Sequence, residues 1–411
     1  MRIGLVVCAL NMGGVATVLK RLNLFLREAG HQVAFVQTQS RGSGVNEFQK
    51  RGFRVVDVLP RSTRSRVHHA RRIARALQEY DAVLLNDTPY AKSVLGLLPD
   101  RTVAISILHM LLPSMVKNAI GNHDEVDAIV VVNPVFKNVL ARRFTRFENR
   151  TFAIANAVEV SDEWPKRGVA AWGRSVLRVI HAGRIEDRQK GSILLPQIVE
   201  EAREFSLDVR LDIVGDGPDL PRLKRHLGTA TGGSGSTLHG TLSHEATVRL
   251  LAESDVLLMP SRFEGLPMVL LEAMALGVVP VVTSLDGIAD HVVRDGENGF
   301  LVNVDDVEGF ARALVRAAED REQLKAMSEA AWQTVRDRFD SRSMGRSYLD
   351  LINDLRRQRS SNACKPRSRS IDKSLLGDLP HIPVRLVRPC RRLLRVARLW
   401  PLVQRFRRPG A

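Results

Sequence analysis

Two carboxylates, Glu264 and Glu272, stand in the apolar segment FEGLPMVLLEA, residues 263–273. Pro267 between them suits a first helical turn, so we expect a helix over 266–276. The amides at the start of such a helix favour a bound anion, such as a diphosphate, by about 0.3–1 kcal/mol. A carboxylate beside a phosphate would repel it. Both acids therefore suit hydroxyl groups better than phosphates.

A plainer interpretation is that Glu264 favours the helix N-terminus and Glu272 is a solvated helix residue. Apolar residues surround Glu272, however, and an acid in such a place is costly without polar partners. The pattern favours a functional role for both.

Two cations follow a predicted strand in the segment HAGRIEDRQKG. Arg184 and Lys190 at a strand's carboxyl end could neutralise a diphosphate without a metal. The alternative is that they are ordinary charges of a surface loop. Gly215 and Gly217, in VGDGP, form a turn at another strand end, and such a pair is often only a tight turn.

The first half of the chain offers a glycine pair and a histidine. Gly13 and Gly14 lie between a strand and a helix, where the backbone can approach a ligand or simply turn. His109 ends another apolar run. A single histidine is usually just a satisfied polar residue, but this one lies where a ligand would bind.

These residues follow short apolar runs that alternate with helical patterns. Near-continuous apolarity indicates strands of a parallel sheet covered on both faces. The runs predicted as strands are 3–10, 32–38, 54–59, 82–86, 103–108 and 128–133, and then 177–183, 209–215, 237–240, 255–260, 279–284 and 299–304. The sequence therefore predicts an α/β protein with two doubly wound, Rossmann-like domains and a site at the carboxyl ends of the strands, in a cleft between them.

The expected domain boundaries follow from this alternation. An N-terminal domain over 1–160 is joined by a linker, 161–176, to a C-terminal domain over 177–338. A helix over 339–358 returns toward the first domain, and a basic tail, 359–411, follows. Within that tail, SSNACKPRSRS reads as a disordered linker.

The charge of +16 is concentrated at the C-terminal end. Residues 356–411 hold sixteen Arg and Lys against Asp372 and Asp378, a net +14, which leaves +2 for the rest. Residues 389–400 (PCRRLLRVARLW) have helical periodicity, with arginines on one face and apolar residues on the other. Residues 385–408 are therefore expected to bind an anionic membrane surface. A solvated, disordered tail and a nucleic-acid contact are the alternatives, the latter less favoured.

Three scattered cysteines, Cys8, Cys364 and Cys390, form no metal-ligand spacing and no disulfide framework, which fits a reducing cytoplasm. The apolar start of the chain reads as a buried first strand rather than a signal peptide. No run of about 18 apolar residues is present to span a membrane.

Together these motifs resemble the retaining nucleotide-sugar glycosyltransferases of glycosyltransferase family 4, which have the GT-B fold. The resemblance covers residues 1–358, and its most specific element is Glu264 to Glu272, set in EGLPMVLLEAMALGVVPVV. AGRIEDRQKG, IVGDGP and DGENGFLV accompany it in order.

The resemblance implies a role for each motif. Glu264 would contact hydroxyls of the donor sugar and Glu272 the ribose, while Arg184 and Lys190 would hold the diphosphate without a metal or other cofactor. The catalytic residues implied are His109, Glu264, Arg184 and Lys190. The donor-binding residues implied are Gly13, Gly14, Gly215, Gly217, Gly265, Leu266, Met268, Val269 and Glu272. Asn156 resembles the asparagine of the inter-domain crossover.

The sequence departs from the family pattern at two places. Val15, Ala16 and Thr17 replace the acidic and basic residues that often follow the glycine pair, and TSLDGIADHVV lacks the usual glycine-glycine and glutamate pattern. These departures concern the choice of donor and acceptor, not the fold.

The sequence therefore predicts a cytoplasmic, metal-independent, retaining hexosyltransferase at the inner face of the cell membrane. It would move a sugar from a nucleotide-sugar to a cell-envelope glycan or lipid-linked acceptor. A nucleotide-sugar epimerase of GT-B architecture and a non-enzymatic polyanion-binding protein on a degenerate transferase scaffold are the rival interpretations.

Overall fold

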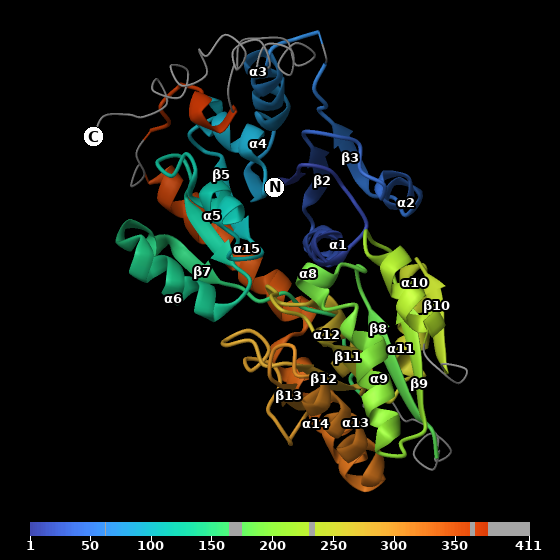
Figure 1. The fold of residues 1–411 in the computed structure, drawn as a ribbon. Coiled ribbons are helices and arrows are strands. Elements are labelled where there is room, and N and C mark those ends of the chain that lie inside the picture. The colour runs from blue at the N-terminus through green and yellow to red at the C-terminus, as the bar shows by residue number, and fades with distance from the viewer. Residues whose placement is uncertain (62, 164–174, 230–234, 362–365, 377–411) are drawn as a thin grey trace. The chain divides into compact units, whose positions relative to one another are not determined.

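The computed structural model describes residues 1–61, 63–163, 175–229, 235–361 and 366–376 (Figure 1). The chain forms two compact units, and each has its own sheet. The first unit comprises Met1–Val132, Phe136–Ile154 and Gly345–Ala411, and the second comprises Asn133–Val135 and Ala155–Met344. The continuous part of the second unit begins at Ala155, before the linker that the sequence placed at 161–176.

The first unit contains a seven-stranded parallel sheet in the order β3-β2-β1-β4-β5-β6-β7. Its strands are β1 Arg2–Val7, β2 Gln32–Gln37, β3 Arg54–Asp57, β4 Ala82–Asn86, β5 Val103–Leu108, β6 Ala128–Val131 and β7 Thr151–Ala153. The strand order reverses between β1 and β4, so this is the point where a doubly wound sheet binds ligands.

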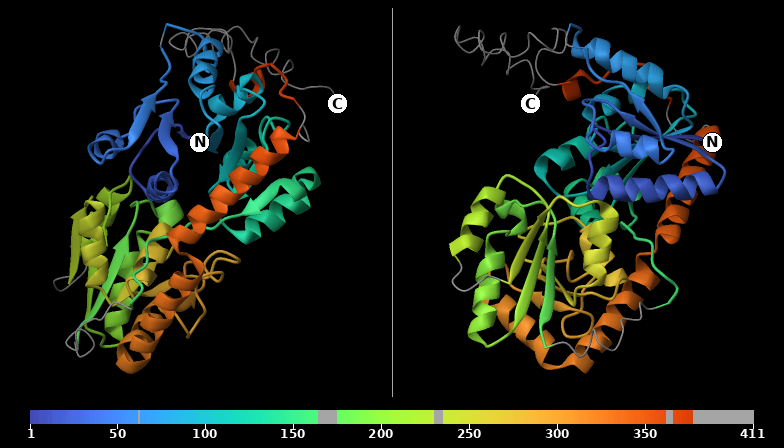
Figure 2. Two further views of the ribbon diagram at one scale, coloured as in Figure 1. Left: turned by 180° about the vertical axis from the view of Figure 1, so that it is seen from behind. Right: turned by 90° about the vertical axis from the view of Figure 1, so that its right-hand side faces the viewer.

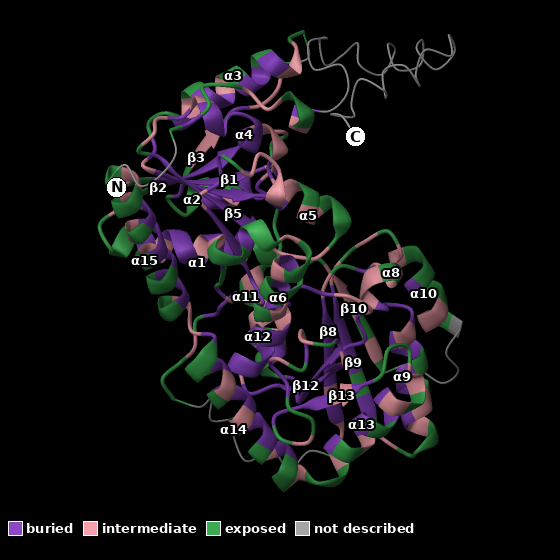
Figure 3. Ribbon diagram, turned by 90° about the vertical axis from the view of Figure 1, so that its left-hand side faces the viewer, coloured by how far each residue is buried: buried purple, intermediate pink, exposed green. Residues whose placement is uncertain are grey.

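Helices cover both faces of this sheet because each presents an apolar stripe to it. They are α1 Gly14–Glu28, α2 Val45–Lys50, α3 Arg66–Leu77, α4 Pro89–Ser93, α5 Pro113–Ile120, α6 Pro134–Arg143 and most of α15 Ser341–Ser360, with short 3-10 turns η1 Leu95–Leu97, η2 Thr145–Arg150 and η3 Lys373–Leu376. Buried strands and outward-facing exposed helix surfaces are seen in Figure 3.

The second unit repeats the same arrangement with six parallel strands in the order β10-β9-β8-β11-β12-β13. They are β8 Leu177–Ala182, β9 Val209–Val214, β10 Ser236–Gly240, β11 Val256–Met259, β12 Val279–Thr283 and β13 Phe300–Val302. Here the order reverses between β8 and β11. The helices are α8 Asp187–Lys190, α9 Leu194–Glu204, α10 Leu220–Thr229, α11 His244–Ala252, α12 Met268–Ala275, α13 Val307–Glu319 and α14 Arg321–Arg338.

The core of the second unit is formed by β8, β9, β11 and β12 with α9 and α13, whose aliphatic side chains are almost completely buried. Figure 2 shows the strands of this unit between their helices. Side-chain caps begin α11, α13 and α14, where Ser243, Asp306 and Asp320 each accept a hydrogen bond from an amide three residues ahead. The prediction of two Rossmann-like α/β domains is confirmed.

Three details differ from the expectations. The first strand ends at Val7 rather than residue 10, because the chain leaves the sheet toward the loop before α1. β7, at the sheet edge, is only three residues long and lacked a distinct apolar run. α12 starts at Met268 rather than Leu266, since Pro267 keeps an extended ψ of 124° and serves as the N-cap.

The prediction that SSNACKPRSRS is a disordered linker is wrong for the part of this segment that the structure describes. Arg367 is 3% exposed and packs into the first unit, although serines, a proline and charges predicted disorder. Its guanidinium donates to the backbone oxygens of Glu125 and Thr102, which a polar sequence does not reveal. Residues 385–408, predicted to bind a membrane, lie outside the described residues.

Candidate functional site

An ion pair lies where the strand order of the second sheet reverses. Lys190, at the end of α8 after β8, donates from Nζ to Oε1 of Glu264, in the loop after β11, at 2.5 Å. The two side chains are only 18% and 5% exposed. The structure thus brings together two residues predicted from separate motifs, at the edge where a parallel sheet binds ligands.

The start of α12 follows directly in the chain. No side chain caps this helix, so its first-turn amides, those of Met268 and Val269 included, are not claimed by an N-cap side chain. The backbone oxygen of Leu266 accepts a hydrogen bond from Nδ2 of Asn156 at 3.2 Å, which ties this loop to the crossover segment. Glu264 precedes the first residue of this helix, Met268, by four positions in the chain.

Two further predicted residues belong to this unit. Arg184 follows β8, and its side chain is 66% exposed and pairs with Glu186 at 3.1 Å. Glu272 is half-buried within α12, between the buried Leu271 and Ala273. Their predicted roles toward the diphosphate and the ribose remain predictions.

Close backbone packing explains why glycine is required at the two positions after β9. The sequence alone could not distinguish this explanation from ligand binding. A Cβ on Gly215, whose φ is 137°, would lie 1.8 Å from the backbone oxygen of Gly183. A Cβ on Gly217 would lie 2.2 Å from that of Ile185. The loops after β8 and β9 therefore pack backbone on backbone, and this contact alone requires both glycines.

His181, in β8, is a site residue that sequence reasoning missed. Its side chain is buried, and Nδ1 donates to the backbone oxygen of Leu258 at 3.0 Å. Nε2 has no hydrogen-bond partner among the described residues. Burial lowers the pKa of His181 to about 4. The hydrogen bond to Leu258 opposes this shift, and the charge of Lys190 adds a smaller decrease. The ring is therefore neutral, and Nε2 is a hydrogen-bond acceptor. In the sequence, only the position of His181 two residues before the Gly-Arg pair could have indicated a role for it.

In the first unit, His109 follows β5. Its Nε2 lies 2.9 Å from Oδ1 of Asn86, at the end of β4, and burial lowers its pKa to about 4. The two residues line a cavity of about 200 Å³ together with Cys8, Asp87 and apolar side chains of β1, β5 and α5. The cavity lies at the reversal point of this sheet, as predicted for a ligand site.

The glycine pair lines a neighbouring hollow. Gly13 is the N-cap of α1 with φ 146°, and a Cβ there would meet nothing within 4 Å. Together with Gly14 and residues of the loop after β1 it lines a space of about 290 Å³. The φ value, rather than crowding, therefore accounts for glycine at position 13.

A polar network beside His109 was also missed. Lys92, fully buried in α4, donates from Nζ to Oγ of Ser106 at 2.6 Å and to the backbone oxygen of Asn118. Nδ2 of Asn118 donates to Oδ1 of Asp87 at 2.6 Å. Burial lowers the pKa of Lys92 to about 7, opposed by the charge of Asp87. Its position in an otherwise unremarkable helix gave no signal.

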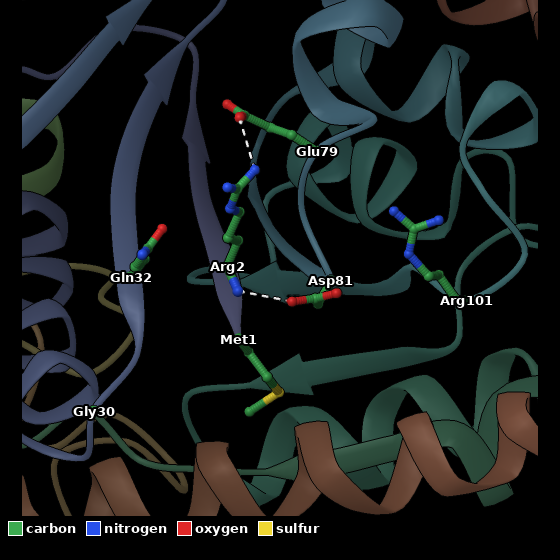
Figure 4. Close-up of a pocket in the computed structure, with 7 residues that line it drawn as sticks. All are labelled: Met1, Arg2, Gly30, Gln32, Glu79, Asp81 and Arg101. Atoms are coloured by element: carbon green, nitrogen blue, oxygen red, sulfur yellow. Dashed lines mark hydrogen bonds and ion pairs between the residues drawn. The ribbon is translucent and has the colours of Figure 1, made fainter.

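Another hollow in the first unit, of about 420 Å³, lies at the opposite edge of the sheet (Figure 4). Its lining residues, which include Met1, Arg2, Gln32 and Asp81, lie near the first residues of the strands. The side chain of Arg2 forms an ion pair with Glu79 at 3.5 Å. Doubly wound sheets bind ligands at the carboxyl edge, so we do not assign the site here.

The described residues contain no group of three or more His, Cys, Asp or Glu side chains that could hold a metal ion. Among the helices in the described ranges, none is long and apolar enough to cross a membrane.

Comparison with known proteins finds a family that the second unit resembles. Residues 177–320 match the family model described as Glycosyl transferases group 1. This part of the chain is therefore similar to group 1 glycosyl transferases. The matched segment contains β8, α8 and α12, and with them the Lys190–Glu264 pair.

Several curated relatives are named as sugar transferases. The phosphatidyl-myo-inositol mannosyltransferase of Mycolicibacterium smegmatis is 27% identical over 345 residues, covering 79% of this chain and 86% of the relative. The sulfoquinovosyl transferase SQD2 of Arabidopsis thaliana is 34% identical over 167 residues, covering 40% and 31%. For the first four relatives the match spans only 29–42% of their length.

Solved structures share the fold over most of the chain. Anabaena Alr3699/HepE, solved in complex with UDP-glucose, superposes with a TM-score of 0.73 over 86% of this chain and all of that one, at 17% identity. The apo lipopolysaccharide outer core galactosyltransferase WaaB superposes at 0.64 over 86% and 99%, at 16% identity. At these identities the likeness shows the fold alone, which is the GT-B fold of two Rossmann-like domains.

Proposed function

We propose that the protein is a retaining, metal-independent glycosyltransferase of family 4 that moves a hexose from a nucleotide-sugar to a cell-envelope glycan or lipid-linked acceptor. The observation that carries the proposal is the Lys190–Glu264 pair beside the uncapped start of α12, inside the segment that matches the group 1 model. The relatives' activities and the UDP-glucose bound by a structural neighbour support a nucleotide-sugar donor.

The diphosphate would lie at the α12 N-terminus, where the amides of Met268 and Val269 and the helix dipole favour an anion. Lys190 would share its charge between Glu264 and the diphosphate, and Arg184 would add a second cation from its exposed loop. These cations would do the work that a divalent ion does in other transferases.

Glu264 would accept hydrogen bonds from sugar hydroxyls, and Glu272 from the ribose. Because Glu264 is 5% exposed, the ammonium of Lys190 keeps its charge compensated when no sugar is bound. Gly215 and Gly217 would let the donor approach the backbone, while Gly265 and Leu266 precede the anion site.

The reaction breaks the bond between the anomeric carbon and the diphosphate and forms a bond from that carbon to the acceptor oxygen on the same face. The acceptor hydroxyl passes its proton to an oxygen of the departing diphosphate. His109, neutral because of burial, would orient a hydroxyl by hydrogen bonding rather than by carrying charge. Gly13 and Gly14 would border the acceptor.

The test is release of nucleoside diphosphate from a panel of UDP- and GDP-sugars, in EDTA, with and without membrane lipid extract. We expect release from one donor, stimulated by the extract, with the anomeric configuration of the product equal to that of the donor. Dependence on added metal would contradict metal independence, an inverted product would contradict retention, and an epimer formed without transfer would identify the rival enzyme class.

A further inference from the structure

Lys190 lies at the end of a helix that is too short to hold its own position. α8 comprises Asp187–Lys190, and the hydrogen bonds that close it run from the amide of Lys190 to the backbone oxygen of Glu186 at 2.8 Å and from that of Gly191 to Asp187 at 3.0 Å. A single helical turn is unstable by itself, because fixing its backbone costs more than these few hydrogen bonds return. The place of the Lys190 ammonium therefore depends on what α8 contacts.

Arg262, in the loop after β11, makes several of these contacts. Its amide donates to the backbone oxygen of Gln189 at 2.7 Å, and Nη1 of its guanidinium donates to the backbone oxygen of Asp187. The same Nη1 lies 3.6 Å from Oδ1 of Asp187. Arg262 thus contacts α8 at its first and third residues, while Glu264 follows two positions later in the same loop.

The guanidinium of Arg262 is also bound to a further loop. Its Nε donates to Oδ1 of Asp305, between β13 and α13, at 2.7 Å. Asp305 has a φ of 60°, a left-handed conformation that is strained for a residue with a side chain and persists where the surrounding contacts fix it. We call the contacts of Arg262 with Asp187, Gln189 and Asp305 the α8 clamp.

Close packing of the backbone joins α8 to the same loop after β11. A Cβ on Gly191, whose φ is 61°, would lie 2.2 Å from the backbone oxygen of Pro260. Nε2 of Gln189 donates to the backbone oxygen of Phe263 at 3.4 Å. These contacts leave little room for α8 to shift while the α8 clamp is in place.

The Lys190–Glu264 pair spans the same two segments as the α8 clamp. Nζ of Lys190 lies 2.5 Å from Oε1 of Glu264, and both side chains are largely buried. Lys190 comes from the connection after β8 and Glu264 from the loop after β11, so their separation depends on how these segments are joined. Arg262 joins them through its backbone and its side chain.

We propose that Arg262 is a positioning residue, which through the α8 clamp sets where the Lys190 ammonium lies relative to Glu264 and to the departing diphosphate. The inference rests on the proposed function, in which Lys190 stabilises charge on the leaving group. Because that charge develops as the bond breaks, a displaced ammonium loses more in the transition state than with the bound donor. A change at Arg262 therefore lowers kcat more than it raises KM.

The test compares Arg262→Met, which keeps the aliphatic stem, with Arg222→Met. Arg222, in α10, also pairs with Asp187, at 3.4 Å, but its side chain is 50% exposed, so this control removes the same charge and another partner of α8. For the donor that the nucleotide-sugar panel selects, we expect kcat of Arg262→Met to fall about 10- to 100-fold. That of Arg222→Met should change by about twofold at most.

A double-variant cycle shows whether Arg262 acts through Lys190. In a Lys190→Met background the ammonium is absent, so Arg262→Met should slow single-turnover release of nucleoside diphosphate by a further twofold at most, roughly. A loss by the same factor in both backgrounds would overturn the inference, because Arg262 would then act independently of Lys190. Equal losses of kcat in Arg262→Met and Arg222→Met would overturn it too.

Amide hydrogen exchange measures the α8 clamp without any substrate. Amides of residues 187–191 should exchange about tenfold faster in Arg262→Met than in Arg222→Met, and unchanged exchange would contradict the clamp. If Arg262→Met does not fold, Asp305→Gly replaces it, since glycine suits the φ of 60° and removes the second carboxylate that Arg262 contacts. The same faster exchange is expected there.

The two readouts separate this inference from the proposed function. Faster exchange in Arg262→Met, in a protein that releases nucleoside diphosphate from no donor of the panel, would refute the proposed function and support the α8 clamp. Donor turnover whose kcat is the same in Arg262→Met and in the parent protein would support the proposed function and refute this inference.

Discussion

Lys190 and Glu264 give the sharpest prediction at the scale of single residues. Replacing Lys190 by Ala leaves Glu264, 5% exposed, without its partner, so we expect a stability loss of about 3 kcal/mol together with a loss of turnover of about 100-fold or more. The variant alone would confound folding with function.

The double variant Lys190→Met, Glu264→Gln separates the two effects. It removes both charges while keeping side-chain volume, so thermal melting should return close to that of the parent protein, whereas nucleoside diphosphate release should stay abolished. Full activity in a stable double variant would show that the pair is structural only.

His181 predicts how stability depends on pH. Its pKa is lowered from 6.5 to about 4 in the folded protein, so the unfolded chain binds a proton between these values and the folded chain does not. The contribution is complete above pH 6.5 and is lost as pH falls toward 4, by at most about 3 kcal/mol.

Denaturant melts at pH 7, 5.5 and 4 measure this contribution. His181→Asn keeps a donor for Leu258 but does not titrate, so its stability should fall less steeply with acidification than that of the parent protein. Identical pH slopes would contradict the assignment. His109 is a less clear probe, because its side chain is only half-buried.

At the scale of elements, the loops after β8 and β9 depend on a glycine. Gly215→Ala would place a methyl group 1.8 Å from the backbone oxygen of Gly183, at a φ of 137°, so we expect a loss of about 2 kcal/mol or more. Gly228→Ala, in α10 with nothing within 4 Å, is the matched control and should be neutral or stabilising by up to about 1 kcal/mol. Equal melting temperatures of the two variants would contradict this role.

Apolar runs predicted twelve of the thirteen strands found in the described residues, because buried parallel strands need no polar face. Two of these strands, β4 and β5, match the predicted bounds. β7 was not predicted because a short edge strand has little apolar pattern. Lys190 and Glu264 could be named as candidates because fixed motifs follow the strand ends. The contacts of Arg367, the Lys92 network and the free acceptor of His181 could not be predicted, since each depends on contacts between segments distant in sequence.

At the scale of the whole molecule, the chain starts one unit, builds a second and returns to the first. Each unit has its own sheet and its own reversal point, and the proposed anion site belongs to the second. A ligand that binds one unit stabilises only that unit directly. A nucleoside diphosphate at 100 times its Kd should add about 2.7 kcal/mol to the second unit, measurable by calorimetry. An unchanged thermogram would contradict a donor site there.

The segment Arg367–Leu376 makes the converse prediction for the first unit. Arg367→Ala would leave Glu125 without its buried cation, while Asp127 keeps its pair with Arg359. We therefore expect this unit to lose about 3 kcal/mol and to unfold at a lower temperature, while nucleoside diphosphate binding to the second unit is unchanged. Arg369→Ala is the matched control two residues along: its side chain is 61% exposed and pairs with Asp100 at the surface, so its loss should cost about 1 kcal/mol or less. Calorimetry with and without nucleotide resolves the two units. If Arg367→Ala and Arg369→Ala unfold at the same temperature, the segment Arg367–Leu376 contributes nothing to the core of the first unit.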